Sequence, residues 1–124
     1  MGRKVSLIMK ISEPPQPLDL SVDPVKEAEY KEEVRRIVLQ AVEGLSCRVF
    51  LFGSRVEGAI RRSSDFDIGI EKLDKDQFWK VRMRIQEAVE ESRVPHEVDV
   101  VHFDTVDETF RRAVGSKVEV WKDA

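Results

Sequence analysis

The sequence has a single cysteine, Cys47, among its 124 residues, so the chain can form no disulfide bond within itself. It has no apolar run near the roughly 20 residues that a membrane-spanning helix requires. Its N-terminus also lacks the hydrophobic segment of a secretory signal peptide. We therefore expect a cytoplasmic protein that does not bind membranes.

The chain also has no excess of positive charge. It contains 21 Lys and Arg residues and 24 Asp and Glu residues, which give a net charge of -3. Proteins that grip long nucleic acid through its phosphates need a clustered excess of Lys and Arg. The composition therefore disfavours a protein that binds long nucleic acid, but it leaves room for a small phosphorylated ligand. The length fits one domain with one hydrophobic core.

Proline separates the start of the chain from the rest. Residues 1–24 include Pro14, Pro15 and Pro17, which interrupt helices and central strands. We expect these residues to form an N-terminal extension and residues 25–124 to form the folded domain.

Within that domain, the periodicity of apolar residues predicts both helices and strands. Asp23 is the expected N-cap of a long amphipathic helix ending near Gly44, and Thr105 with Glu108 predicts a capping box at the start of a short helix. A further helix is expected at 76–92, with strands at 48–52, 65–71, 98–103 and 117–121. This order predicts an α+β fold in which helices flank a small mixed sheet.

Two acidic residues lie within one of the expected strands. Alternation places Phe66 and Ile68 on one face of that strand and leaves Asp65 and Asp67 together on the other. Two carboxylates on one face repel each other and resist burial. A cation is therefore expected to lie between them.

Asp99 interrupts a later apolar strand in the same way. If the two strands are neighbours, three carboxylates gather, and such hard oxygen ligands suit magnesium or manganese. Two ions about 3.5–4 Å apart would clamp an in-line phosphoryl displacement. We therefore predict that Asp65, Asp67 and Asp99 are catalytic and bind the metal. A salt bridge to an arginine is the alternative interpretation of Asp99.

The strand at 48–52 is followed by Gly53, Ser54 and Arg55. Glycine lets the backbone approach a ligand closely, and the residues after it predict a short helix whose amides attract phosphate. The serine hydroxyl and the arginine guanidinium are further donors for phosphate oxygens. We predict that all three residues bind a nucleotide, although Arg55 suits a salt bridge to Glu57 or to an aspartate equally well.

Together these residues resemble the nucleotidyltransferases of the DNA polymerase beta type, whose signature is Gly-Ser, a spacer, Asp-x-Asp and a third acid on a later strand. The stretches GSRVEGAIRRSSDFDIGI and EVDVV look more narrowly like the minimal nucleotidyltransferases of bacteria and archaea, and the likeness covers about residues 34–121. It implies the polymerase beta-like fold, with the three aspartates holding two Mg²⁺ or Mn²⁺ ions. It also implies that Gly53 and Ser54 bind the triphosphate of ATP or another NTP.

The resemblance further implies a partner protein. Small members of this family act as antitoxins of an all-helical HEPN-domain RNase toxin and transfer AMP from ATP to a tyrosine of that toxin. One alternative is a non-catalytic antitoxin that neutralises its partner by binding. Another is nucleotidyl transfer to a small molecule or an RNA end. Because the chain is barely larger than a catalytic core, we expect the acceptor to be a partner protein or a molecule bound at the interface of a homo-oligomer.

Other residues whose side chains could bind a metal or take part in catalysis are expected to have structural roles. His96 and His102 lie six residues apart at the two ends of a strand and have no cysteine partner, so we expect surface histidines rather than metal ligands. Trp79 and Trp121 are expected to be core or interface aromatics.

Overall fold

The computed structural model describes residues 23–58 and 65–124. The predicted N-terminal extension therefore lies almost wholly outside the described residues. In chain order the elements are α1 (Pro24–Ala41), β1 (Arg48–Phe52), α2 (Ser54–Glu57), β2 (Phe66–Glu71), α3 (Lys75–Glu90), β3 (Val98–His102), the 3₁₀ turn η1 (Phe103–Thr105), α4 (Glu108–Val114) and β4 (Glu119–Lys122).

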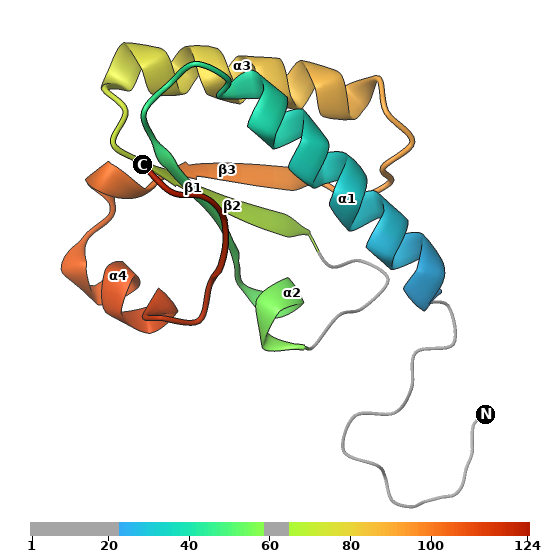
Figure 1. The fold of residues 1–124 in the computed structure, drawn as a ribbon. Coiled ribbons are helices and arrows are strands. Elements are labelled where there is room, and N and C mark those ends of the chain that lie inside the picture. The colour runs from blue at the N-terminus through green and yellow to red at the C-terminus, as the bar shows by residue number, and fades with distance from the viewer. Residues whose placement is uncertain (1–22, 59–64) are drawn as a thin grey trace, which may run out of the picture.

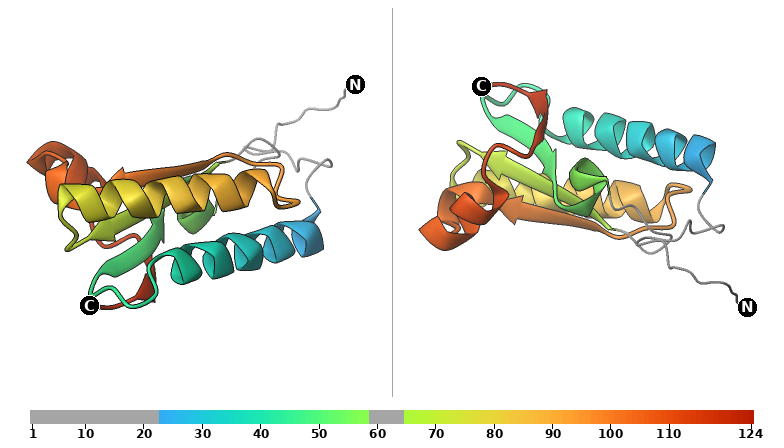
Figure 2. Two further views of the ribbon diagram at one scale, coloured as in Figure 1. Left: turned by 90° about the horizontal axis from the view of Figure 1, so that it is seen from above. Right: turned by 90° about the horizontal axis from the view of Figure 1, so that it is seen from below.

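The strands form one four-stranded sheet in the order β3-β2-β1-β4. β1 pairs antiparallel with β2 and with β4, whereas β2 and β3 run parallel. The helices α1 and α3 cover one face of the sheet, α4 lies on the other, and α2 lies at the end of β1 (Figures 1 and 2). The predicted α+β class with a small mixed sheet is confirmed.

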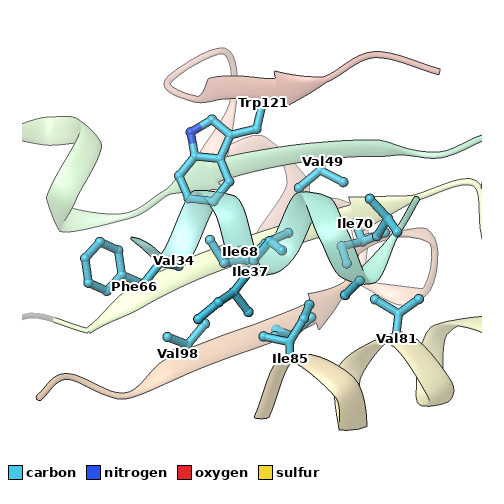
Figure 3. Close-up of a cluster of buried hydrophobic side chains, with 14 of the residues drawn as sticks. Val34, Ile37, Val49, Phe66, Ile68, Ile70, Val81, Ile85, Val98 and Trp121 are labelled. Carbon is cyan, nitrogen blue, oxygen red and sulfur yellow. The ribbon is translucent and has the colours of Figure 1, made fainter. Parts of the chain in front are cut away.

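The main core lies between the sheet and the pair α1 and α3. Alternate residues of the strands point into it because side chains on a strand alternate between faces. These residues meet apolar side chains at helical spacing on α1 and α3, as Figure 3 shows for Val34, Ile37, Val49, Phe66, Ile68, Ile70, Val81, Ile85, Val98 and Trp121. Since Phe66 and Ile68 are fully buried here, the register of β2 is fixed.

The start of α1 is the one predicted, because the Asp23 carboxylate accepts hydrogen bonds from the amides of Val25 and Lys26 at 3.0 and 3.3 Å. The predicted cap of α4 is wrong. Asp107 caps that helix through the amide of Phe110, whereas the Thr105 hydroxyl donates to the carbonyl of His102 and closes η1. Asp107 takes the N-cap position because the Thr105 hydroxyl is already hydrogen-bonded within the 3₁₀ turn.

A smaller aromatic cluster covers the opposite face of the sheet. Phe50, Phe52 and Phe103 are buried there, and the rings of Phe50 and Phe103 meet edge to face with their centroids 4.9 Å apart. The burial of β1 on both faces, which its nearly continuous apolar sequence predicts, is confirmed.

The absence of a side chain at Gly69 leaves space for the rings of this aromatic cluster. A Cβ at Gly69 would lie 2.5 Å from two ring carbons of Phe50 and 3.1 Å from Phe103. We expect Gly69→Ala to lower the free energy of unfolding by roughly 1–3 kcal/mol, the usual cost of overpacking, as measured by urea denaturation. Phe50→Leu in the same chain should recover part of that loss. A Gly69→Ala variant as stable as the wild type would contradict this packing.

Candidate active site

The parallel pairing of β2 with β3 brings two of the predicted catalytic residues together. Asp67 and Asp99 are partners in the strand register, and their neighbours Phe66 and Val98 are buried in the main core. Because neighbouring residues on a strand point to opposite faces, both carboxylates point away from α1 and α3. Asp65 immediately precedes β2 and is exposed. The structure therefore places the three predicted aspartates at one end of two adjacent strands.

The charges of these aspartates act on one another. Partial burial raises the pKa of Asp67, and the negative charges of Asp99 and Asp65 raise it further. Burial and neighbouring negative charges both disfavour the ionised form of a carboxyl group. A cation bound among these carboxylates would remove that penalty.

The described residues contain no group of three or more His, Cys, Asp or Glu side chains that is already placed to hold a metal ion. Carboxylates repel one another, so these side chains are not expected to converge without a cation between them. Their oxygens nevertheless form the hard donor set that Mg²⁺ and Mn²⁺ prefer. The chemistry of the site therefore fits these ions.

Gly53 lies directly against this acidic cluster. It follows β1, whose last residue, Phe52, is the register partner of Asp67. Its φ of +85° is a conformation that favours glycine, and a Cβ would overlap the Asp67 carboxylate oxygen Oδ2 and lie 3.2 Å from its Cγ. Gly53 is thus required both by the turn and by the close approach of the backbone to Asp67.

Ser54 begins α2 immediately after this turn. The helix has only four residues, too few for a macrodipole of consequence, since that dipole grows with the number of aligned peptide units. The position of Ser54 is set instead by the Gly53 turn that it follows. The predicted short helix after Gly53 is present, and its first residue, Ser54, directly follows the glycine that lies against Asp67.

The side chain of Arg55, which was predicted to bind a nucleotide or to form a salt bridge, is buried against α1. Only 2% of its side chain is exposed, and Nη1 lies 2.8 Å from Oε1 of Glu27 on α1. The guanidinium of Arg55 is thus held in a buried ion pair, and its contact with a phosphate stays a prediction. The alternative of a salt bridge was correct in kind but not in partner.

The histidines also differ from the prediction, because neither is a surface residue. The His96 ring is buried and its Nε2 lies 3.1 Å from Oε2 of Glu27. The His102 ring stacks on Phe78 with the ring centroids 4.5 Å apart, and its Nε2 lies 2.8 Å from the carbonyl oxygen of Leu73. Each ring is held by a protein acceptor, which explains how a polar side chain is tolerated inside.

Glu27 was not identified from the sequence. It lies in the first turn of α1, among many charged residues of that helix, and nothing in the spacing separates it from its solvated neighbours. Trp121 is buried as expected, whereas Trp79 is half exposed on α3. None of the helices in the described part of the chain has the length and hydropathy of a membrane-spanning segment.

A family model and a curated relative both match this chain. The family model described as "Polymerase beta, Nucleotidyltransferase" matches residues 47–122, a span that contains all the predicted site residues. The probable protein adenylyltransferase MntA of Haemophilus influenzae is 37% identical over 84 residues, which cover 65% of this chain and 68% of that protein.

Solved structures share the fold at lower identity. A crystal structure of a toxin-antitoxin with AMP-PNP contains a chain that is 22% identical, with a TM-score of 0.53 and coverage of 74% of this chain and 73% of that chain. The tri-AMPylated Shewanella oneidensis HEPN toxin in complex with MNT antitoxin contains one that is 15% identical, with a TM-score of 0.50 and coverage of 79% and 73%. With the family match, the relative and the placement of the aspartates in agreement, this chain belongs to the polymerase beta nucleotidyltransferase family.

Proposed function

We propose that this chain is a metal-dependent protein adenylyltransferase that transfers AMP from ATP to a tyrosine hydroxyl of a HEPN toxin and thereby acts as its antitoxin. The observation that carries the proposal is the register pairing of Asp67 with Asp99, together with a Gly53 backbone that approaches the Asp67 carboxylate. The relative named as a probable protein adenylyltransferase supports the choice of AMP and of a protein acceptor.

Asp65, Asp67 and Asp99 are the residues that would hold the metal. Their carboxylate oxygens fit Mg²⁺ or Mn²⁺, and burial together with the negative charges of Asp99 and Asp65 raises the pKa of Asp67. When bound, such ions supply neutralisation of the charge that develops on the phosphates during displacement. The number of ions that we propose is two, as in the two-ion sites that carry out in-line phosphoryl transfer.

The remaining chemistry belongs to the protein's own groups. The turn at Gly53 brings the backbone close to where the phosphates of ATP would lie, and the Ser54 hydroxyl donates a hydrogen bond to a phosphate oxygen. Asp99, which is more exposed than Asp67, accepts the proton of the tyrosine hydroxyl. The tyrosine oxygen then bonds to the α-phosphorus, the bond from that phosphorus to the bridging oxygen breaks, and pyrophosphate leaves.

Intact-mass spectrometry of the partner toxin tests this function. After incubation with Mg²⁺, ATP and this protein, we expect the HEPN toxin to gain the mass of one or more AMP groups and to lose its RNase activity. The Asp65→Ala, Asp67→Ala double variant should add no AMP. Asp123→Ala removes an aspartate whose side chain is 84% exposed, and it should add AMP as the wild type does.

The same experiment separates the proposal from the competing functions. Inhibition of the toxin by the wild type and by the double variant, with no change of mass in either case, would establish an antitoxin that acts by binding alone. Consumption of ATP only when a small molecule or RNA replaces the toxin would move the acceptor to that class.

A further inference from the structure

The side chain of Arg55 is buried between α1 and the start of β2. Besides its ion pair with Glu27 at 2.8 Å, its Nε donates a hydrogen bond to the main-chain carbonyl of Asp65 at 3.2 Å. Its guanidinium lies over the Phe66 ring, with Cζ 3.8 Å from the ring centroid. The residue that follows Ser54 is therefore fixed to the backbone between the two aspartates of the Asp-x-Asp motif.

Glu27 connects this cluster to the segment that leads into β3, the strand of Asp99. Its second oxygen lies 3.1 Å from Nε2 of His96, and the His96 ring meets Phe66 edge to face at a centroid distance of 5.9 Å. His96 lies three residues before Asp99, on the segment that leads into β3. The N-terminal end of α1 and this segment lie at the same end of the molecule (Figures 1 and 2).

The three segments that carry the candidate site residues thus meet at one buried polar cluster, made of Glu27, Arg55 and His96. Arg55 comes from the segment of Ser54, its hydrogen bond reaches the segment of Asp65, and Glu27 joins it to the segment of Asp99. The hydrogen bonds of Arg55 to the Asp65 carbonyl and of His96 to Glu27 fix the distances between these segments more strictly than apolar packing does, because hydrogen-bond geometry is directional.

Stability alone gives no reason for such a cluster. Desolvation of two charges cancels much of their attraction, and apolar replacements of a buried ion pair are often neutral or stabilising. Catalytic groups, in contrast, must be held within about 0.5 Å of their working geometry by supporting contacts. The position of this cluster between the site segments therefore points to a role in positioning the site rather than in stabilising the fold.

We propose that Arg55, held by Glu27, is a positioning residue that sets the distance between the Gly53-Ser54 turn and the aspartates. It acts through the main chain of Asp65 and through α2, and it does not touch the nucleotide. The proposal rests on the nucleotidyltransferase function of the site, but it concerns an arrangement that exists before any ligand binds.

The test replaces the pair without leaving a buried charge alone. Glu27→Gln with Arg55→Met removes both charges, keeps the side-chain volumes and leaves an amide oxygen for His96. The matched control is Glu33→Gln with Arg36→Met, an ion pair of 2.6 Å on the surface of α1. For each protein we would measure the melting temperature, amide hydrogen exchange of the ligand-free chain, and the affinity for Mn²⁺ with AMP-PNP by calorimetry.

We expect the buried-pair variant to melt within about 3 °C of the wild type. Amide exchange at residues 54–57 should be faster by about tenfold or more, and affinity for the nucleotide should fall by about tenfold or more, since small misplacements in a site carry costs of that order. The control variant should match the wild type in all three measurements.

Unchanged exchange in α2, or unchanged affinity despite faster exchange, would overturn the proposal. If the double variant does not fold, Arg55→Lys decides the question, because it keeps the charge beside Glu27 but loses the Nε donor and the planar group over Phe66. It should then show the same two changes. Hydrogen exchange needs no ligand, so it reports on positioning even if AMP transfer to a toxin is never observed.

Discussion

Replacing Asp67 with asparagine should abolish nucleotidyl transfer without destabilising the fold. The side chain is the register partner of Asp99 and lies against the Gly53 turn, so it is at the centre of the proposed metal site. Loss of even an outer-shell partner of a metal ligand costs about 10–100-fold in affinity or activity. We expect loss of the ligand itself to lower the rate of AMP transfer by more than about 100-fold.

The expectation for stability follows from the raised pKa of Asp67. Burial, Asp99 and Asp65 all disfavour its ionised form, so the folded protein binds this proton more tightly than the unfolded chain does. Its contribution to stability is fully present below the unfolded pKa, about 3.9, and is lost as the pH rises through the folded pKa. At neutral pH the ionised Asp67 therefore destabilises the metal-free fold.

Thermal melting from pH 3.5 to 7 measures this effect. The metal-free Asp67→Asn variant should melt at the same temperature as the wild type or higher at neutral pH, with an advantage that shrinks as the pH falls. Mn²⁺ should raise the melting temperature of the wild type more than that of the variant. A variant that melts well below the wild type at pH 7, or that still transfers AMP at the wild-type rate, contradicts this assignment.

Gly53→Ala should damage both the fold and the site. An alanine at φ near +85° has a backbone cost of roughly 1–2 kcal/mol, and its Cβ would overlap the Asp67 carboxylate. Relief of that overlap requires Asp67 or the turn to move. We expect a loss of more than about 2 kcal/mol of unfolding free energy by urea denaturation, together with loss of most of the transferase activity.

Gly44→Ala is the matched control for this substitution. Gly44 has nearly the same φ, +84°, but nothing lies within 4 Å of the position of its Cβ. It should show the backbone cost alone and keep its activity. If Gly53→Ala and Gly44→Ala lose equal stability and both remain active, the close approach of Gly53 to Asp67 has no functional consequence.

Much of this arrangement follows from local sequence patterns. Alternation of apolar residues predicted which face of β2 carries Asp67, and the burial of Phe66 and Ile68 confirms it. The apolar run around Asp99 predicted a second strand of the same kind. The parallel pairing that places Asp99 opposite Asp67 was an assumption at that point, because strand order depends on how the connecting helix α3 packs.

The polar cluster around Arg55 was beyond such patterns. Glu27, Arg55 and His96 come from three distant segments, and each alone resembles a residue in contact with solvent. Only the tertiary structure shows that they share a buried volume. The α4 cap was missed for a more local reason, since Thr105 and Asp107 are both good N-cap residues and the 3₁₀ turn between β3 and α4 decided between them.

Calorimetric titration with Mn²⁺ and AMP-PNP tests most directly whether the acidic cluster binds a nucleotide through divalent ions. The wild type should release or absorb heat with a saturable affinity that disappears when Mn²⁺ is omitted and in the Asp65→Asn, Asp67→Asn double variant. Equal binding by the wild type and this variant, or no heat from the wild type beyond that of dilution, would contradict the assignment of Asp65, Asp67 and Asp99 as metal ligands.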